Sequence, residues 1–389
     1  YSWDIDKDYD GSYEGLIGDP AITHDYVVSV DQTVADTAFS VAGTITVANP
    51  HPTQAMTVSL TDSVGGTPAT LDCGGTLEVP AGGTATCGYT AALGDTAPEP
   101  GTNTATATLN GIGFTGTAPY AVGEPTTVVG YAEINVTDTN GQSWTASGDD
   151  SWTYTKDFQC PADPTLYVGG FYTMPADTNT AAIVETEQSD TATVALTCYA
   201  PTVTKTAAGT YDETHDWTIE KTVSPEAQSG FIGDTLEYEW TVVVTEDVTE
   251  GNFAVTGEIV VSNPGTLPMI MTLSDVLDDG SPAAITGCTG GTWAAPNLTV
   301  AGGQAATCSY SAAPTGRTAT LNTATVTLGE IAFPATDAVE WTANVINPSV
   351  DLGDDQNPDL PPTISDGGTW TYTEYYTCST DTADYANGN

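Results

Sequence analysis

A stretch of twelve residues that occurs twice constrains the fold more than any other feature of this sequence. Residues 39–50 read FSVAGTITVANP and residues 253–264 read FAVTGEIVVSNP, an offset of 214 residues. Every second residue in both copies is apolar, which predicts a β-strand with one buried face. The glycine in the middle of each copy predicts a bulge or a close approach of another backbone, and the Asn-Pro that ends it predicts a turn.

Other segments recur in the same order and extend this repeat. The Trp-x-Ile-x-Lys pattern of residues 3–7 returns at 217–221, and the TNTATATL of 102–109 returns as LNTATVTL at 321–328. A fixed period indicates a modular array, and short strands separated by Gly, Pro and Asn turns are typical of immunoglobulin-like β-sandwiches. Thr, Val and Gly are abundant and helix formers are scarce, which also favours strands.

The sequence therefore predicts an all-β protein of tandem immunoglobulin-like β-sandwiches in a rod, with larger and smaller sandwiches alternating. We expect a larger sandwich over residues 1–124 and a smaller one over 125–203. A second larger sandwich is expected over 204–344, and an incomplete smaller one, which repeats 125–170, over 345–389.

Three segments carry a resemblance to a known family: WTIEKTVSPEAQSGFIGDTLEYEWTVVV, VSNPGTLPMIMTLSDVL and LNTATVTL. They resemble the conserved immunoglobulin-like repeat domain of bacterial and archaeal extracellular surface proteins. The resemblance covers residues 204–344 and, more loosely, 1–124, where Asp8-Tyr9 stands in place of Thr-Val after Lys7. Members of this family are stalks, adhesins and sheath or filament components. The resemblance implies an extracellular or cell-surface location and no enzymatic activity.

The net charge of the chain limits the classes of molecule that it is expected to bind. The net charge is −46, from 51 acidic and 5 basic residues. Such a surface repels nucleic acid and anionic lipid, so neither is an expected partner. No apolar run is long enough to insert into a membrane. The motifs of nucleophile elbows, P-loops, zinc proteases and dinucleotide sites are absent, so we expect neither an enzyme nor a bound cofactor.

The seven cysteines indicate disulfides. They form no Cys-x-x-Cys pair and stand near no histidine, so a zinc site is not expected. Spaced cysteines in an acidic β-protein indicate an oxidising compartment. We predict the pairs Cys73–Cys87, Cys160–Cys198 and Cys288–Cys308. The odd cysteine, Cys378, either stays unpaired or bonds outside the chain.

Four acidic residues near the start offer a weak calcium motif. Asp6, Asp8, Asp10 and Glu14 resemble the beginning of an EF-hand loop, but Ile17 occupies the position of its bidentate glutamate. The segment is either a Ca²⁺-binding turn between strands or an acidic turn with no ion.

Two lysines occupy equivalent positions in the repeat, and so do two late-strand asparagines. Some pilin sandwiches join a lysine on an early strand to an asparagine on a late strand through an isopeptide bond. That chemistry needs a buried, neutral lysine beside a carboxylic acid. One interpretation of the pattern is a cross-link within each larger sandwich, from Lys7 to Asn103 and from Lys221 to Asn322. The alternative is that each lysine forms an ion pair with a neighbouring carboxylate.

The repeat suggests how copies of the chain assemble. No segment after Cys378 repeats residues 191–198, so we expect the last sandwich to lack its closing strands. The segment Tyr1–Lys7, with Trp3 and Ile5 as inward anchors, is then a candidate donor strand for the last sandwich of a neighbouring copy. The alternative is that this sequence is part of a longer polypeptide, in which the missing strands are covalently continuous. Head-to-tail contacts of this kind build a filament. The sequence thus predicts a structural subunit of an extracellular homopolymer.

A binding role is the alternative to the structural one. A monomeric cell-surface adhesin or carbohydrate-binding stalk protein has the same composition and would take surface glycans as partners. Asn135 and Asn297 begin Asn-x-Thr sequons, which either carry sugar or arise by chance.

Overall fold

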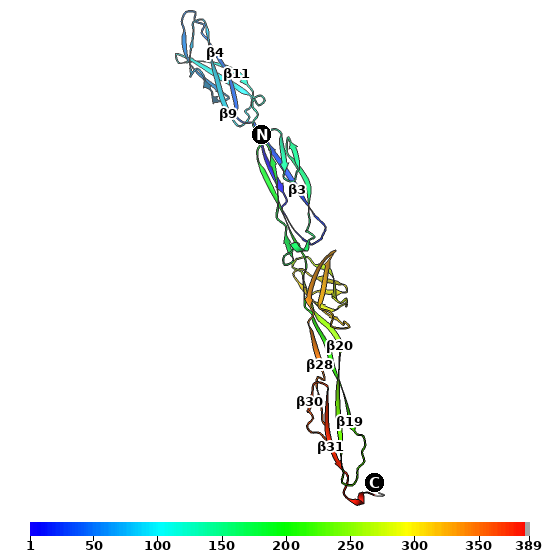
Figure 1. Ribbon diagram of the computed structural model, residues 1–389. Helices are drawn as coiled ribbons and strands as arrows, with labels where there is room; N and C mark the ends of the chain where they lie inside the picture. The colour runs from blue at the N-terminus through cyan, green and yellow to red at the C-terminus, as the bar shows by residue number, and fades with distance from the viewer. Residues whose placement is uncertain (386–389) are drawn as a thin grey trace. The chain divides into compact units, whose positions relative to one another are not determined.

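The chain is built almost entirely from strands. The computed structural model describes residues 1–385, and its helices are the short 3₁₀ segments η1 (Pro164–Leu166) and η2 (Thr382–Asp384). Figure 1 shows the strands along the chain. None of the helices in residues 1–385 is long and apolar enough to cross a membrane. The strands divide between two compact units: residues 1–10, 24–156 and 177–193 form the first, and the remaining described residues form the second.

Residues 39–120 of the first unit form one β-sandwich from a continuous segment of the chain, and we call it sandwich I. Its first sheet has the order β4-β9-β7 and its second has the order β11-β10-β5-β6, with β8 also paired to β5. Val58, Leu60, Leu77 and Val79 form its core with Cys87. The strands are β4 (Phe39–Ala48), β5 (Met56–Val64), β6 (Thr67–Pro68), β7 (Thr70–Leu71), β8 (Thr76–Val79), β9 (Thr84–Gly94), β10 (Gly101–Leu109) and β11 (Ile112–Tyr120).

The rest of the first unit is sandwich II, which the chain enters twice. One sheet has the order β1-β3-β14, and the other includes β13-β12-β16-β17. The chain leaves sandwich II after β3, forms sandwich I and returns at β12. Its strands are β1 (Ser2–Asp8), β3 (Ile22–Thr33), β12 (Ile134–Asp138), β13 (Ser143–Ala146), β14 (Asp150–Phe158), β16 (Asp177–Ile183) and β17 (Ser189–Tyr199).

The core of sandwich II differs from the contiguous division predicted from the sequence. Trp3, Val28 and Val30 pack with Ile134 and Ile183 in one buried cluster. The predicted boundary between residues 124 and 125 therefore does not separate two cores. The alternation of apolar residues identifies each strand but does not identify the strand that covers it.

The predicted donor strand is also wrong. Residues 2–8 pair with residues 27–33 of β3, and the side chain of Trp3 is buried in the core of its own sandwich. Ile5 packs against the same core. Because this strand is hydrogen-bonded and its apolar side chains pack within its own sandwich, it cannot at the same time complete the sandwich of another copy.

In the second unit, β2 (Gly11–Leu16) pairs in parallel with residues 194–199 of β17. The short strand β15 (Phe171–Thr173) pairs antiparallel with the same part of β17. The disulfide Cys160–Cys198 lies in this region.

Sandwich III, also in the second unit, repeats the main strand pairings of sandwich I and adds the strands β18 and β23. Its first sheet contains β22-β25-β20, with β18 on the free side of β20, and its second has the order β23-β24-β21-β26-β27. Its core is the largest of the chain and includes Ile259, Met271 and Val326. The strands are β18 (Thr202–Lys205), β20 (Thr235–Ser262), β21 (Met269–Leu277), β22 (Ala284–Thr289), β23 (Thr292–Ala294), β24 (Asn297–Val300), β25 (Ala305–Ala312), β26 (Leu321–Leu328) and β27 (Ile331–Ala338).

Sandwich IV shares the long strands of sandwich III. β19 (Ala208–Ser224) and β20 pair along most of their length, as the two labelled strands in Figure 1 show. Residues 235–244, at the start of β20, pair with β31 (Gly368–Thr377). β28 (Trp341–Ile346) pairs in parallel with β19, and β29 (Val350–Asp351) pairs with β30 (Thr363–Ile364).

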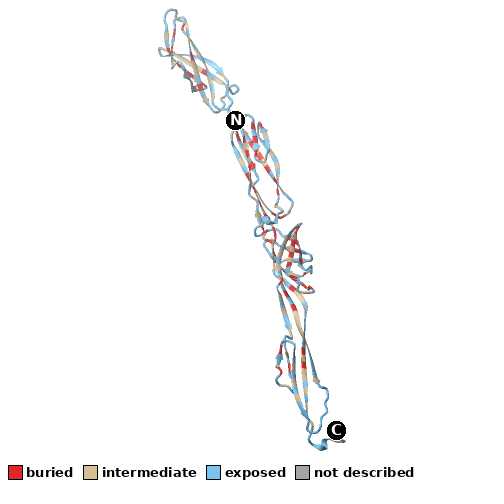
Figure 2. Ribbon diagram, in the orientation of Figure 1, coloured by how far each residue is buried: buried red, intermediate tan, exposed pale blue. Residues whose placement is uncertain are grey.

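The boundary predicted between residues 344 and 345 therefore does not hold either. Val242 and Val244 of β20 form one core with Leu352, Leu360 and Ile364. Sandwich III is inserted in the sequence of sandwich IV, as sandwich I is inserted in that of sandwich II. The predicted fold class, an all-β chain of tandem β-sandwiches, is confirmed, and Figure 2 shows buried residues within each sandwich.

Candidate cross-link sites

A lysine, an aspartate and an asparagine meet in the core of sandwich III. Lys205 ends β18, Asp275 lies on β21 and Asn322 lies on β26. In the pairing of β21 with β26, Asp275 is opposite Ala324, two residues beyond Asn322. Side chains two residues apart on a strand share a face, so both polar side chains point into the sandwich.

Asp275 contacts both of the other side chains. Lys205 Nζ lies 2.9 Å from Asp275 Oδ2, and Asn322 Nδ2 donates to the same oxygen at 3.3 Å. The Lys205 and Asp275 side chains have no exposed area, and Asn322 is 0 % exposed. Within residues 1–385, the second oxygen of Asp275 and the amide oxygen of Asn322 have no hydrogen-bond partner. A buried set that leaves two acceptors unsatisfied calls for an explanation beyond stability.

Burial shifts both titratable groups toward their neutral forms. Desolvation lowers the pKa of the Lys205 amine, although the contact with Asp275 opposes the shift. Desolvation raises the pKa of the Asp275 carboxyl, and Lys205 again opposes it. The Lys205 Nζ also lies 3.4 Å from the centre of the Tyr310 ring. Burial thus favours an uncharged amine beside a protonated acid, whereas the face of the Tyr310 ring favours the charged amine.

This arrangement can carry out an amide exchange. A neutral lysine amine is a nucleophile, and the asparagine side chain offers a carbonyl carbon with an amide nitrogen as leaving group. The Asp275 carboxyl touches both nitrogens, so it can take the proton that the amine loses and pass it to the departing ammonia. The product is a Lys205–Asn322 isopeptide bond.

The aspartate–asparagine pair recurs at one register in three sandwiches. Asp62 is opposite Ala105, Asp138 is opposite Ala181, and Asp275 is opposite Ala324. An asparagine stands two residues before each alanine, in the sequences Asn103-Thr-Ala, Asn179-Thr-Ala and Asn322-Thr-Ala. This Asn-Thr-Ala triplet is the sequence signal that would have found the sites.

Sandwich II holds a complete set with a fourth member. Lys7 Nζ donates to Asp138 Oδ2 at 2.5 Å and to the Tyr154 hydroxyl at 2.9 Å. Asn179 donates to the same tyrosine hydroxyl and accepts from Thr139. The Lys7 and Asp138 side chains are fully buried. Tyr154 therefore stands between the lysine and the asparagine, whereas in sandwich III both contact the aspartate directly.

Sandwich I holds the aspartate and the asparagine without a lysine. Asp62 and Asn103 are 6 % and 5 % exposed. Within residues 1–385, neither carboxylate oxygen of Asp62 has a hydrogen bond of good geometry, and neither does the amide oxygen of Asn103. Burial raises the pKa of Asp62, which the Asn103 side chain and the Ser63 backbone oppose in part.

Sandwich IV holds a more open lysine. Lys221 Nζ lies 2.5 Å from Asp354 Oδ2, and its side chain is 33 % exposed. The hydrogen bond from Lys221 lowers the pKa of Asp354 to about 2, and Tyr372 donates to the same carboxylate. This site is a charged ion pair at the surface of a small core.

The structure corrects the lysine–asparagine pairs predicted from the sequence. Lys7 contacts Asp138 in sandwich II, whereas Asn103 lies beside Asp62 in sandwich I. Lys221 contacts Asp354, whereas Asn322 belongs to the set of Lys205. The alternative prediction, an ion pair between each lysine and a carboxylate, agrees with the structure for both Lys7 and Lys221. Sequence reasoning missed Lys205 because the first copy of the repeat has no counterpart of it.

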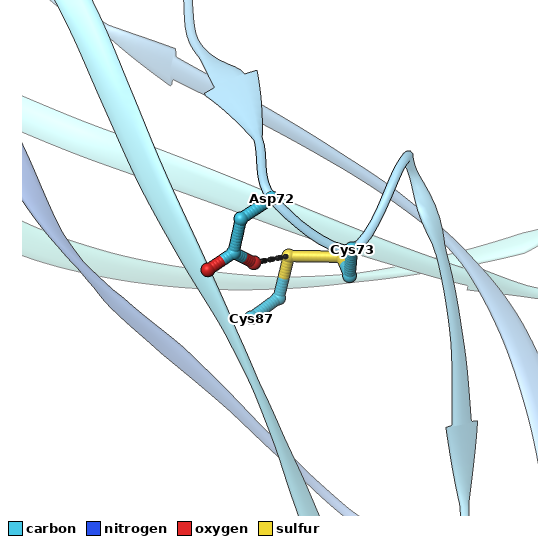
Figure 3. Close-up of side chains that lie close together, drawn as sticks. All are labelled: Asp72, Cys73 and Cys87. Carbon is cyan, nitrogen blue, oxygen red and sulfur yellow. Dashed lines mark hydrogen bonds between the residues drawn. A yellow bond between two sulfur atoms is a disulfide. The ribbon is translucent and has the colours of Figure 1, made fainter.

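All three predicted disulfides are present. Cys73–Cys87, Cys160–Cys198 and Cys288–Cys308 are bonded, and Cys378 is a half-buried free thiol among the described residues. Figure 3 shows Asp72 beside the first disulfide, with its Oδ1 3.4 Å from Cys87 Sγ. Because disulfide sulfurs offer no thiolate, this group is not a metal site.

The four residues predicted to bind calcium are not gathered into one group. Within residues 1–385, the one group of three close side chains of metal-ligand type is Asp72, Cys73 and Cys87. Asp10 accepts a hydrogen bond from the Thr193 backbone, and Glu14 accepts one from Tyr199. Desolvation and neighbouring like charges raise the pKa of Asp6, while Asp8 is exposed. Calcium binding stays a prediction.

The two sequon asparagines are exposed. Asn135 lies on β12, where its side chain donates to Glu185 at 2.7 Å. Asn297 begins β24. Attachment of sugar at either position stays a prediction.

The comparisons with known proteins add little to this description. No family model matches the chain, and no curated protein matches it significantly. Among solved structures, "I-band fragment I67-I69 from titin" is 7 % identical, with 87 % of this chain and 99 % of that chain covered and a TM-score of 0.16. "Sidekick-1 immunoglobulin domains 1-5" is 10 % identical, with 82 % and 86 % covered and a TM-score of 0.14. The fold assignment rests on the strand pairing of the chain itself.

Proposed function

We propose that this chain is a load-bearing structural protein of an extracellular appendage, with sandwiches locked internally by lysine–asparagine bonds. The observation that carries the proposal is the buried contact of Lys205, Asp275 and Asn322. A bond between Lys205 and Asn322 would join β18 to β26 covalently. Force along the chain could then not extend the residues between them. The three disulfides support an oxidising, extracellular compartment.

The proposed reaction is a single event in each sandwich and not an enzymatic turnover. The amine and the amide are both consumed, and the product is part of the protein. No cofactor is needed, because the aspartate handles the protons and ammonia is the leaving group.

Single-molecule force spectroscopy on the full chain tests the load-bearing role. In the native protein, residues 205–322 should stay closed when the other sandwiches unfold. Lys205→Ala should release that segment and lengthen the fully unfolded chain by roughly 330 Å, at about 3.4 Å per residue, because the Cys288–Cys308 disulfide keeps 20 residues of the segment closed. Lys221→Ala, which removes a half-exposed ion pair in sandwich IV, is the matched control and should not lengthen it. Equal lengths for the native chain and Lys205→Ala would contradict the proposal.

Assembly into a homopolymer is the finer part of the proposal. Sandwiches with open strand edges are suited to main-chain pairing between copies, and such heterologous contacts build filaments. Electron microscopy of the secreted protein tests this point. Long polymers of uniform width are expected, whereas isolated particles that bind glycans would support the alternative, a cell-surface adhesin.

A further inference from the structure

We propose that sandwich I is an acceptor for an extended, lysine-bearing strand from outside the described residues, which it joins covalently to Asn103. The inference rests on the cross-linking chemistry proposed above. It is carried by a comparison inside the chain, because sandwich III shows the same site with its strand in place.

The edge of β4 is the first observation. β4 stands at the end of its sheet and pairs with β9 alone, and its inward side chains are only half-buried. The corresponding part of β20 pairs on its other side with β18. Ile259 and Val261, the counterparts of Ile45 and Val47, are both 0 % exposed. The inward face of β4 therefore has the apolar residues of a buried strand, but no neighbouring strand of the described residues covers its edge.

A groove lies where the missing strand would run. It has a volume of about 540 Å³ and a mainly apolar lining contributed by β4, β5, β10 and β11. The counterparts of these strands are β20, β21, β26 and β27. In sandwich III, β18 pairs with β20 and also contacts β27. The groove thus has the position and the walls of the β18 slot.

Asp62 and Asn103 lie beside this groove. Ala105, which lines the groove, is directly opposite Asp62 in the strand pairing. Both polar side chains are more than nine-tenths buried, and they occupy the positions that Asp275 and Asn322 have in sandwich III. Residues 39–120 contain no lysine, and a lysine amine would give Asp62 the partner that Lys205 gives to Asp275.

The register of β18 specifies the occupant. In sandwich III, Lys205 is opposite Ile259 and Val203 is opposite Val261. The partner strand should therefore run antiparallel to β4, with its lysine opposite Ile45 and a small apolar residue opposite Val47. Glycine at position 43 fits the same arrangement, because a Cβ on its counterpart Gly257 would collide with the Thr206 carbonyl oxygen that follows the lysine.

The covalent step is balanced without any further reagent. The lysine Nζ attacks the Asn103 Cγ, the bond from Cγ to the amide nitrogen breaks, and ammonia leaves. Asp62 takes a proton from the amine and delivers one to the leaving nitrogen. One amine and one primary amide give one secondary amide and one ammonia.

The test uses the full chain and a synthetic peptide with the sequence of residues 200–207, APTVTKTA. Incubation should give an adduct whose mass is the sum of the two minus one ammonia, and digestion should place the link at Asn103. Asn103→Ala and Asp62→Ala should each abolish the adduct. Thr44→Ala, on the exposed face of β4, is the matched control and should retain it. A peptide with norleucine in place of lysine should give none, which keeps the test valid if a protein variant fails to fold.

The outcomes separate this inference from the proposed function. If the linked Lys205–Asn322 peptide is found in the same digest but no adduct forms at Asn103, the acceptor site is wrong and the proposed function stands. If neither link is found, both are wrong. Binding of the norleucine peptide as tightly as the lysine peptide would make the groove a general apolar docking site and overturn the lysine assignment.

Discussion

Sandwiches I and III share their main strand pairings, equivalent disulfides and the same buried aspartate–asparagine pair. They differ at one sheet edge, where sandwich I has no counterpart of β18 among the described residues. In sandwich III, β18 covers β20 and brings Lys205 to Asp275. In sandwich I, the edge of β4 is open and Asp62 has no cation. Phe114 on β11 is consequently 62 % exposed, whereas its counterpart Phe333 packs against the core of sandwich III. One four-residue strand thus decides both the burial of two sheet edges and the chemistry of the polar site.

The largest expected effect comes from removing the lysine. Lys205→Ala leaves the Asp275 carboxyl buried without its partner, which typically costs about 3–5 kcal/mol, and it also removes the proposed cross-link. Hydrogen exchange followed by mass spectrometry should show sandwich III losing protection while sandwich I is unchanged. Thr204→Ala on the same strand is the control and should change stability by about 0.5 kcal/mol or less. Equal losses in the two variants would contradict the comparison.

Reduction of the disulfides should affect sandwich I more than sandwich III. The Cys73–Cys87 bond closes a short loop, for which about 3 kcal/mol of stabilisation is typical. Sandwich III loses the Cys288–Cys308 bond as well, but the proposed Lys205–Asn322 link would still constrain its unfolded chain. Thermal unfolding with and without reductant, followed by peptide-level protection, measures the difference. A larger loss of protection in sandwich III would count against the cross-link.

Asp62→Asn should stabilise sandwich I at neutral pH, by on the order of 1 kcal/mol. Burial raises the folded-state pKa of Asp62, so the native protein binds this proton more tightly than the unfolded chain does. The contribution of Asp62 to the free energy of unfolding is therefore fully present below its unfolded pKa of 3.8 and is lost as the pH rises through the folded pKa.

The matched substitution in sandwich III should have the opposite sign. Asp275→Asn removes the partner of Lys205 and should destabilise that sandwich. Denaturant unfolding at several pH values checks both variants, and stabilisation by Asp275→Asn would show that the two aspartates do not differ as described.

The smallest expected difference concerns two tyrosines. The Tyr310 hydroxyl donates to the Thr206 carbonyl oxygen at 2.6 Å, and burial raises the pKa of this tyrosine to about 12. Its counterpart Tyr89 lies over Gly43, where no strand equivalent to β18 is present in the described residues. Tyr310→Phe should cost about 1 kcal/mol and Tyr89→Phe close to nothing, as measured by urea unfolding.

Local features of the fold could be predicted from the sequence. The alternation in residues 39–50 and 253–264 gave two strands, and the mid-strand glycine at 257 does mark a close approach by the Thr206 backbone. The pairs Cys73–Cys87 and Cys288–Cys308 followed from cysteines that flank a turn signal, and Cys160–Cys198 followed from cysteines that each follow a predicted strand. These features depend on neighbours in sequence, which periodicity and turn chemistry describe well.

The partners of strands distant in sequence could not be predicted in the same way. Trp3 packs with Ile134 and Val242 packs with Leu352 because each outer sandwich is interrupted by a complete inner one. Alternation carries no information about which strand covers a face. The cross-link site was misplaced for the same reason, since Lys221 repeats Lys7 in sequence while Lys205, on an unrepeated strand, is the one that reaches Asn322.

Peptide mapping of the native protein tests the central claim most directly. After digestion under non-reducing conditions, the account predicts a branched peptide in which Lys205 is joined to Asn322 and which is lighter than its two parts by one ammonia. Asp275→Ala should abolish this peptide and leave the three disulfide-linked peptides unchanged. Recovery of separate, unmodified peptides containing Lys205 and Asn322 from the native protein would contradict the account.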